Sequence, residues 1–126
     1  MSANTIKLNG SNFLRQRLIL STLSGKNVKI TKIRESEADP GLTEYEMNLL
    51  RMIEAITNGT TVKVNETGTI LFYSPGMLIG GDVTHSCSKV RSVGYYLEVL
   101  LALAPFCANP VKANGFRLDK IVLNSF

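Results

Sequence analysis

The feature that most limits the possible folds is the regular exchange between strand patterns and helix patterns along the chain. Apolar residues alternate with polar ones over short stretches, and then recur every three or four positions. The elements predicted in this way are a strand Thr5–Leu8, a helix Asn12–Ser24, a strand Asn27–Ile33, a helix between Thr43 and Asn58, a hairpin Thr61–Tyr73, a further strand and a helix Val90–Phe106. This order indicates an α/β or α+β fold with helices packed on one face of a sheet.

The first predicted helix has an unusual start. It follows the turn Gly10–Asn12, whose Ser and Asn side chains are good helix caps, and it ends at Gly25. Arg15 and Arg17 lie near its amino-terminal end, where the helix dipole disfavours cations. A strand, a glycine-containing turn and a helix in succession often bind phosphate in α/β proteins. The two arginines therefore indicate either an anion site or a plain solvated surface.

The other two helices differ in how they bury their apolar side chains. The second begins with Thr43 and Glu46, which form a capping-box pattern, and then carries one apolar stripe. The third has a stripe that Val99 and Leu103 widen until most of its surface is apolar. A helix of that kind is buried against a structure larger than its own hairpin.

Positive charge is concentrated at the start of the chain. Seven of the 14 basic residues and none of the ten acidic residues lie in the first 34 positions, so that segment carries +7 and the rest −3. The seven are Lys7, Arg15, Arg17, Lys26, Lys29, Lys32 and Arg34. Such asymmetry favours a polyanionic partner, above all nucleic acid. The alternative is a solvated basic face that keeps the protein soluble.

Several classes of protein are excluded by simple features. No apolar run reaches the roughly 18 residues of a membrane span, and no signal-peptide pattern opens the chain, so we expect an intracellular protein without a membrane partner. Two cysteines and one histidine lack metal-ligand spacing, so no metal or other cofactor is expected. Asp82 and His85 by themselves are weak evidence for acid–base catalysis.

Several segments together resemble the RNA 3′-terminal phosphate cyclase superfamily. They are Gly10–Lys26, Ile33-Arg34, Pro40-Gly41-Leu42, Ile56–Thr60, Tyr73–Asp82 and Gly94–Phe106, within a match that covers about Ile6 to Phe106. Within the superfamily they are more similar to its eukaryotic ribosome-assembly branch than to the active cyclases. The family fold of repeated βαβαββ units implies a first unit over residues 1–76 and an incomplete second unit over 77–126. The tail from about residue 112 is atypical, which indicates a fragment or a departure from the family's reading frame.

The resemblance also implies what the chain has lost. Active cyclases carry a glycine-rich segment with a glutamate where this chain has Gly10–Asn12, and they form an adenylate on a histidine that His85 does not match. Three positions that are basic or glutamine in the cyclases are here Glu37, Tyr45 and Glu98. Two cyclase arginines are kept, as Arg15 and Arg34. The resemblance therefore implies a protein that is not an enzyme. The candidate contacts to an anion or RNA phosphate are Arg15, Arg34, Lys7, Lys29 and Lys32.

The function implied by the resemblance is that of a ribosome-biogenesis factor in the nucleolus of the nucleus. Such a factor acts in the small-subunit processome and is needed for early pre-rRNA cleavages. Its implied partners are a ribosome-assembly GTPase, pre-rRNA and the small nucleolar ribonucleoprotein. The alternatives are an RNA-processing enzyme, either a cyclase or a pre-rRNA endonuclease, and a non-functional truncated product. The basic segment has Phe13 but little other aromatic interleaving, so no base-stacking platform is expected.

Overall fold

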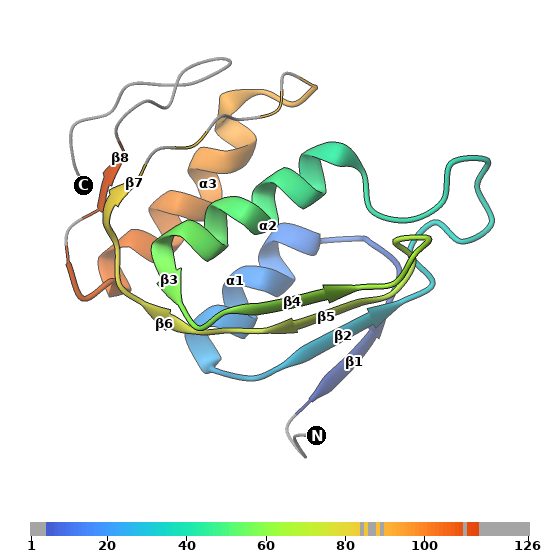
Figure 1. The fold of residues 1–126 in the computed structure, drawn as a ribbon, viewed down its shortest axis with the longest axis horizontal. Coiled ribbons are helices and arrows are strands. Elements are labelled where there is room, and N and C mark those ends of the chain that lie inside the picture. Colours follow the sequence, from blue (N-terminus) through green and yellow to red (C-terminus); the bar gives the residue numbers. More distant parts are fainter. Residues whose placement is uncertain (1–4, 84, 86–87, 89, 110, 114–126) are drawn as a thin grey trace. The chain divides into compact units, whose positions relative to one another are not determined.

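The fold mixes helices with a four-stranded sheet and two smaller pairs of strands (Figure 1). The computed structural model describes residues 5–83, 85, 88, 90–109 and 111–113. Its elements are β1 (Ile6–Asn9), α1 (Leu14–Ser24), β2 (Val28–Thr31), α2 (Glu44–Ile56), β3 (Thr57–Asn58), β4 (Thr61–Val64), β5 (Leu71–Ser74), β6 (Met77–Leu78), β7 (Gly81–Val83), α3 (Val93–Leu103) and β8 (Val111–Ala113). The expected mixed fold class is confirmed. Cys87 and the tail beyond residue 113 lie outside the described residues.

The chain forms two compact units and passes from one to the other three times. The first unit holds the segments up to Thr43 and Thr60–Gly76, and the second holds Glu44–Gly59 and the segment from Met77 onward. The sheet strands β1, β2, β4 and β5 and the helix α1 therefore belong to the first unit, whereas α2 and α3 belong to the second. The proposed repeat boundary between residues 76 and 77 stays a prediction.

The sheet of the first unit has the strand order β1-β2-β5-β4 (Figure 1). The β1 and β2 strands run parallel and are joined by α1, whereas β5 is antiparallel to both of its neighbours. The β4–β5 hairpin turns at residues 65–69, which confirms the hairpin expected over Thr61–Tyr73. Residues that are far apart in the sequence, at positions 6–9 and 61–64, thereby come to opposite edges of one sheet.

One face of this sheet forms the core of the first unit, and we call it the inner face. Alternating residues of β2 and β5 point to it, and α1 lies along it with Leu14 and Leu18 buried. The buried strand residues on this face are Val28, Ile30, Leu71 and Tyr73. Fully burying an aliphatic side chain contributes about 1.5–3 kcal/mol, so this layer supplies most of the unit's stability. The hydroxyls of Thr22 and Tyr73 lie 2.7 Å apart and satisfy each other in this core.

The start of α1 differs from the expectation. The helix begins at Leu14, and its capping position is Phe13, which has a left-handed φ of 58° and makes no side-chain capping bond. A cap at residues 10–12 is therefore wrong. The reason lies in the sheet, because the Gly10 amide still bonds the Thr31 carbonyl at 2.7 Å and leaves only residues 11–13 for the turn. The predicted end at Gly25 is confirmed, with a left-handed φ of 72°.

The second strand is shorter than predicted. It ends at Thr31 because Lys32 takes a φ of 57°, which no extended strand contains. The next residue, Ile33, is fully buried in the core. Arg34 again has a positive φ, of 47°.

The second unit is built on α2, α3 and two short strand pairs. It buries apolar residues from both helices: Leu49, Leu50, Met52, Ile53, Ile56, Tyr96, Val99, Leu100 and Leu103. The third helix is shorter than predicted and continues as a 3₁₀ turn over Ala104–Phe106. Cys107 is a free thiol and is half-buried. Across the part of the chain that the structure describes, no helix combines the length and the apolar character needed to cross a membrane.

Candidate nucleic-acid interface

The face of the sheet that points away from α1, which we call the outer face, carries a row of basic side chains. In the strand register Lys7 pairs with Lys29, Lys29 with Phe72, and Phe72 with Lys63. Cross-strand partners project to the same face. The four residues therefore form one line across the whole sheet, and we call it the lysine row. With strands 4.7–4.9 Å apart, the row is about 14 Å long.

The lysine row is accessible and free of negative charge. All three lysines are exposed and Phe72 is half-buried. The four strands of the sheet contain these three lysines and no acidic residue. The nearest acid in sequence is Glu66 in the hairpin turn. No carboxylate of the sheet strands therefore competes with an external anion for the ammonium groups.

Two rows of neutral polar residues flank the lysine row on the outer face. On one side the Thr31 hydroxyl donates to the Asn9 side chain at 2.8 Å. On the other side the Ser74 hydroxyl donates to the Asn27 side chain at 2.9 Å. These bonds join neighbouring strands through their side chains and hold the polar groups in place. The lysine row thus lies between two pairs of polar side chains, and the face also carries one exposed apolar residue, Ile70, two positions before Phe72.

The five candidate cations from the sequence analysis lie in different parts of the structure. Lys7 and Lys29 are neighbours on the outer face. Arg15 belongs to α1, the helix that lies along the inner face (Figure 1). Lys32 and Arg34 follow β2 in left-handed conformations, and the Arg34 guanidinium donates to the Gly41 carbonyl at 3.2 Å. Anion binding by Arg15 and Arg34 stays a prediction.

Two residues of the lysine row were missed by reasoning from the sequence. Lys63 and Phe72 lie outside the basic first 34 residues, and nothing in the linear order links them to Lys29. The alternation of Val62, Lys63 and Val64 does predict that this lysine faces away from the core. Phe72 gave no such signal, because it stands in a stretch that is continuously apolar. The sheet order alone places an aromatic ring between two lysines.

At the Gly10 turn, which the resemblance aligns with the glycine-rich segment of the cyclases, one backbone amide and one guanidinium make hydrogen bonds within the chain. The Gly10 amide donates a hydrogen bond to the Thr31 carbonyl. The Arg17 guanidinium donates to the Gly10 carbonyl at 2.8 Å and reaches the Asn9 carbonyl at 3.4 Å. Arg17 therefore holds the turn against the helix. The turn contains no carboxylate that could bind a metal ion.

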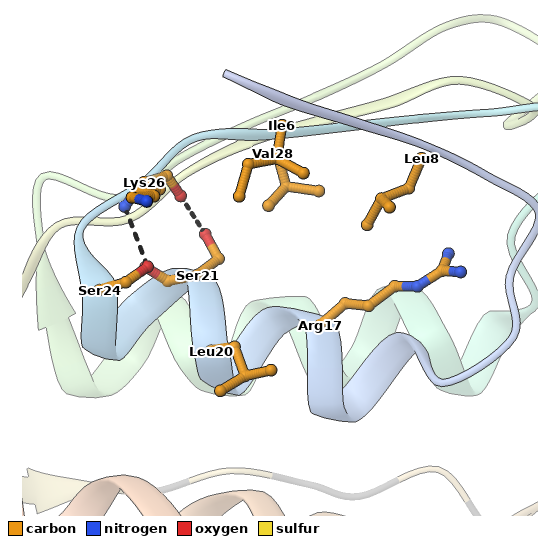
Figure 2. A pocket seen from close by; sticks show the side chains of 8 residues that line it. All are labelled: Ile6, Leu8, Arg17, Leu20, Ser21, Ser24, Lys26 and Val28. Atoms are coloured by element: carbon orange, nitrogen blue, oxygen red, sulfur yellow. Dashed lines mark hydrogen bonds between the residues drawn. The ribbon is translucent and has the colours of Figure 1, made fainter. Parts of the chain in front are cut away.

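A groove of about 270 Å³ lies between α1 and the edge of the sheet (Figure 2). Its walls are mainly apolar, and the strand side chains of Ile6, Leu8 and Val28 point into it. The other lining residues are Arg17, Leu20, Ser21, Ser24 and Lys26. Both serine hydroxyls already donate to backbone carbonyls: Ser21 to that of Lys26 at 2.6 Å, and Ser24 to that of Ser21 at 3.3 Å. The lining thus contains no acid or histidine that could activate a nucleophile.

Several polar side chains of the second unit make contacts within the chain. His85 lies 2.7 Å from the Asn48 side-chain oxygen, and burial lowers the pKa of its imidazole below the ordinary value. The Asn48 amide is uncharged, unlike the carboxylate that orients the histidine of a catalytic triad. Tyr45, at a position where the cyclases have glutamine, packs edge-on against Tyr95, and the Arg91 guanidinium lies 4.7 Å from its ring centre. The side chain of Asp82 lies outside the described residues.

Comparison with known proteins gives consistent results. A family model described as RNA 3′-terminal phosphate cyclase matches residues 6–114. The RNA 3′-terminal phosphate cyclase-like protein of Homo sapiens is 54% identical over 110 residues, which are 87% of this chain and 30% of that protein. A probable cyclase-like protein of Dictyostelium discoideum is 48% identical over 121 residues, 94% of this chain and 33% of the relative.

A third relative has a name that states a process. The rRNA processing protein RCL1 of Saccharomyces cerevisiae is 48% identical over 97 residues, which are 77% of this chain and 26% of that protein. The chain thus spans a third or less of the length of these relatives.

Proposed function

The chain belongs to the RNA 3′-terminal phosphate cyclase family, and from that premise we propose that it is a non-catalytic factor of rRNA processing. The proposal follows the relatives named cyclase-like and the yeast relative named as an rRNA processing protein. Because the chain spans only part of their length, the proposal concerns what these 126 residues contribute to such a factor.

The observation that carries the non-catalytic part is the state of the Gly10 turn. Nucleotidyl transfer needs positive charge and usually a metal at the phosphates, together with a nucleophile. In this turn the Gly10 amide and the Arg17 guanidinium donate hydrogen bonds to backbone carbonyls. These contacts hold the start of α1 against the sheet, and the turn offers no carboxylate for a metal ion.

The partners in this proposal are those that the family resemblance implies. The protein acts as a scaffold in the small-subunit processome, in the nucleolus, where it binds a ribosome-assembly GTPase and pre-rRNA with its small nucleolar ribonucleoprotein. The exposed lysines of the outer face support contact with RNA phosphates, because lysine is a compact point charge suited to such contacts.

The proposal is tested by depleting the protein from cells that make it and probing precursor rRNA by hybridisation. We expect the precursor of the small-subunit rRNA to accumulate uncleaved, while the large-subunit rRNA is still made. Unchanged processing after full depletion would overturn the proposal.

The non-catalytic part has a separate test. The purified chain is incubated with labelled ATP and an RNA that ends in a 3′-phosphate. We expect neither an adenylated protein nor a cyclic phosphate end, and a labelled protein band would assign the chain to the enzymes instead. Cleavage of a pre-rRNA fragment that spans an early processing site would assign it to the endonucleases.

A further inference from the structure

We propose that the outer face of the four-stranded sheet binds single-stranded RNA, with one unpaired base stacked on Phe72 and the flanking phosphates held by the lysine row. This inference rests on the proposed role in rRNA processing for the identity of the ligand. The surface itself is assigned by the register of the strands.

The first argument is the position of Phe72. Its ring lies on β5 between Lys29 on one side and Lys63 on the other, and it remains partly exposed. A core position would bury such a ring, as the neighbouring Tyr73 is buried on the inner face. Base–aromatic stacking contributes substantially to single-strand binding and needs only the flat face of the ring.

The second argument is the geometry of the charge. Lys29 and Lys63 belong to the strands on either side of the ring, so each lies about 5 Å from Phe72 across the sheet. Both lysine side chains are exposed and project from the same face of the sheet as the ring. A nucleotide on the ring would therefore have its two phosphates within reach of one lysine each. Lys7 extends the row by one strand.

The third argument concerns what the face lacks. A duplex hides the flat surfaces of its bases, so an aromatic platform distinguishes single strands from duplexes. Phe72 has no hydrogen-bonding group and cannot read a base edge. The side-chain oxygens of Asn9 and Asn27 already accept from the hydroxyls of Thr31 and Ser74. The face should consequently bind single strands with little preference for sequence.

The experiment measures the binding of a fluorescent ten-nucleotide RNA without secondary structure to the full chain by anisotropy, over a range of salt concentrations. The variant Lys29→Ala/Lys63→Ala should weaken binding about tenfold or more at low salt. It should also reduce the slope of log affinity against log salt by about 1.4, because each single-strand phosphate contact contributes about 0.7.

The matched control removes the same charge elsewhere. Lys26→Ala/Arg51→Ala also deletes two exposed cations, neither of which lies on the outer face. It should change affinity less than threefold. If it weakens binding as much as the lysine-row variant, the protein binds RNA through its overall charge and the proposal fails.

The ring is tested independently of charge. Phe72→Leu should weaken binding about fivefold or more and leave the salt slope unchanged, because stacking releases no counterions. Phe72→Tyr keeps the platform and should bind as the unmodified chain does. If Phe72→Leu binds normally, or if an RNA duplex of equal length binds as well as the single strand, the proposal is wrong.

The RNA-binding test and the rRNA-processing test can fail independently of each other. A chain required for pre-rRNA cleavage whose outer-face variants bind RNA normally would keep its function and lose this surface. An acidic polypeptide, polyglutamate, is added as competitor. If it displaces the RNA while Phe72→Leu has no effect, the face is one for acidic protein segments, and the proposal is overturned.

Discussion

The two faces of the four-stranded sheet are made by the same strands and have opposite characters. The inner face contains Val28, Ile30, Leu71 and Tyr73, each at most 3% exposed. The outer face carries the lysine row and two rows of neutral polar residues. Alternation along a strand separates the faces, and pairing between strands assembles each of them. Stability should therefore respond to one face and RNA binding to the other.

The largest expected effect comes from adjacent residues of β2. Ile30→Ala removes a fully buried side chain and should lower the free energy of unfolding by about 2–5 kcal/mol. Lys29→Ala, one residue earlier on the exposed outer face, should change it by no more than about 0.5 kcal/mol. Urea denaturation followed by circular dichroism measures both. Equal losses for the two variants would contradict the division into faces.

A smaller effect should distinguish a buried hydrogen bond from a half-buried one. Tyr73→Phe deletes the hydroxyl that lies 2.7 Å from that of Thr22 in the core, and it should cost about 1 kcal/mol. Thr22 keeps its bond to the Leu18 carbonyl, which limits the loss. Ser74→Ala removes a bond on the outer face and should cost about half as much. Thermal melts of the two variants test the order, and a larger loss for Ser74→Ala would reverse the argument.

A substitution at Lys32, directly after β2, should stabilise the folded protein. Lys32 is exposed and has a φ of 57°, a conformation that costs a residue with a side chain about 1 kcal/mol more than glycine. Lys32→Gly should therefore raise the free energy of unfolding by about 0.5–1 kcal/mol. Lys29→Gly is the control, because its strand conformation is ordinary and glycine there should destabilise by a similar amount. A loss of stability in both variants would show that Lys32 makes contacts that outweigh its strain.

The smallest effect distinguishes the sheet from the second unit. The only histidine of the chain, His85, lies in the second unit, and burial lowers the pKa of its imidazole. The unfolded chain therefore takes up a proton near pH 6.5 that the folded chain resists, so stability should fall as the pH drops through that value. Unfolding curves between pH 5 and 8 measure the slope. His85→Gln should flatten it, while Ile30→Ala should shift the whole curve without changing its slope.

Much of the fold could be predicted because it depends on local patterns. Apolar alternation predicted β1, β2 and the hairpin, and apolar residues at helical spacing predicted α1, α2 and α3. The ends were less accurate. Lys32 and Phe13 adopt left-handed conformations, although neither is a residue type that favours them, so the early end of β2 and the late start of α1 carried no sequence signal.

The sequence by itself determined which residues of each strand face solvent, where the positive charge is concentrated, and which family the segments resemble. Only the tertiary structure decided which of those residues are neighbours. It placed Lys63 and Phe72 beside Lys29, although more than 30 residues separate them along the chain, and it placed α1, to which Arg15 belongs, along the inner face (Figure 1). The physical reason is that side-chain direction follows from the backbone period within one strand, whereas strand order follows from how the whole apolar face is buried.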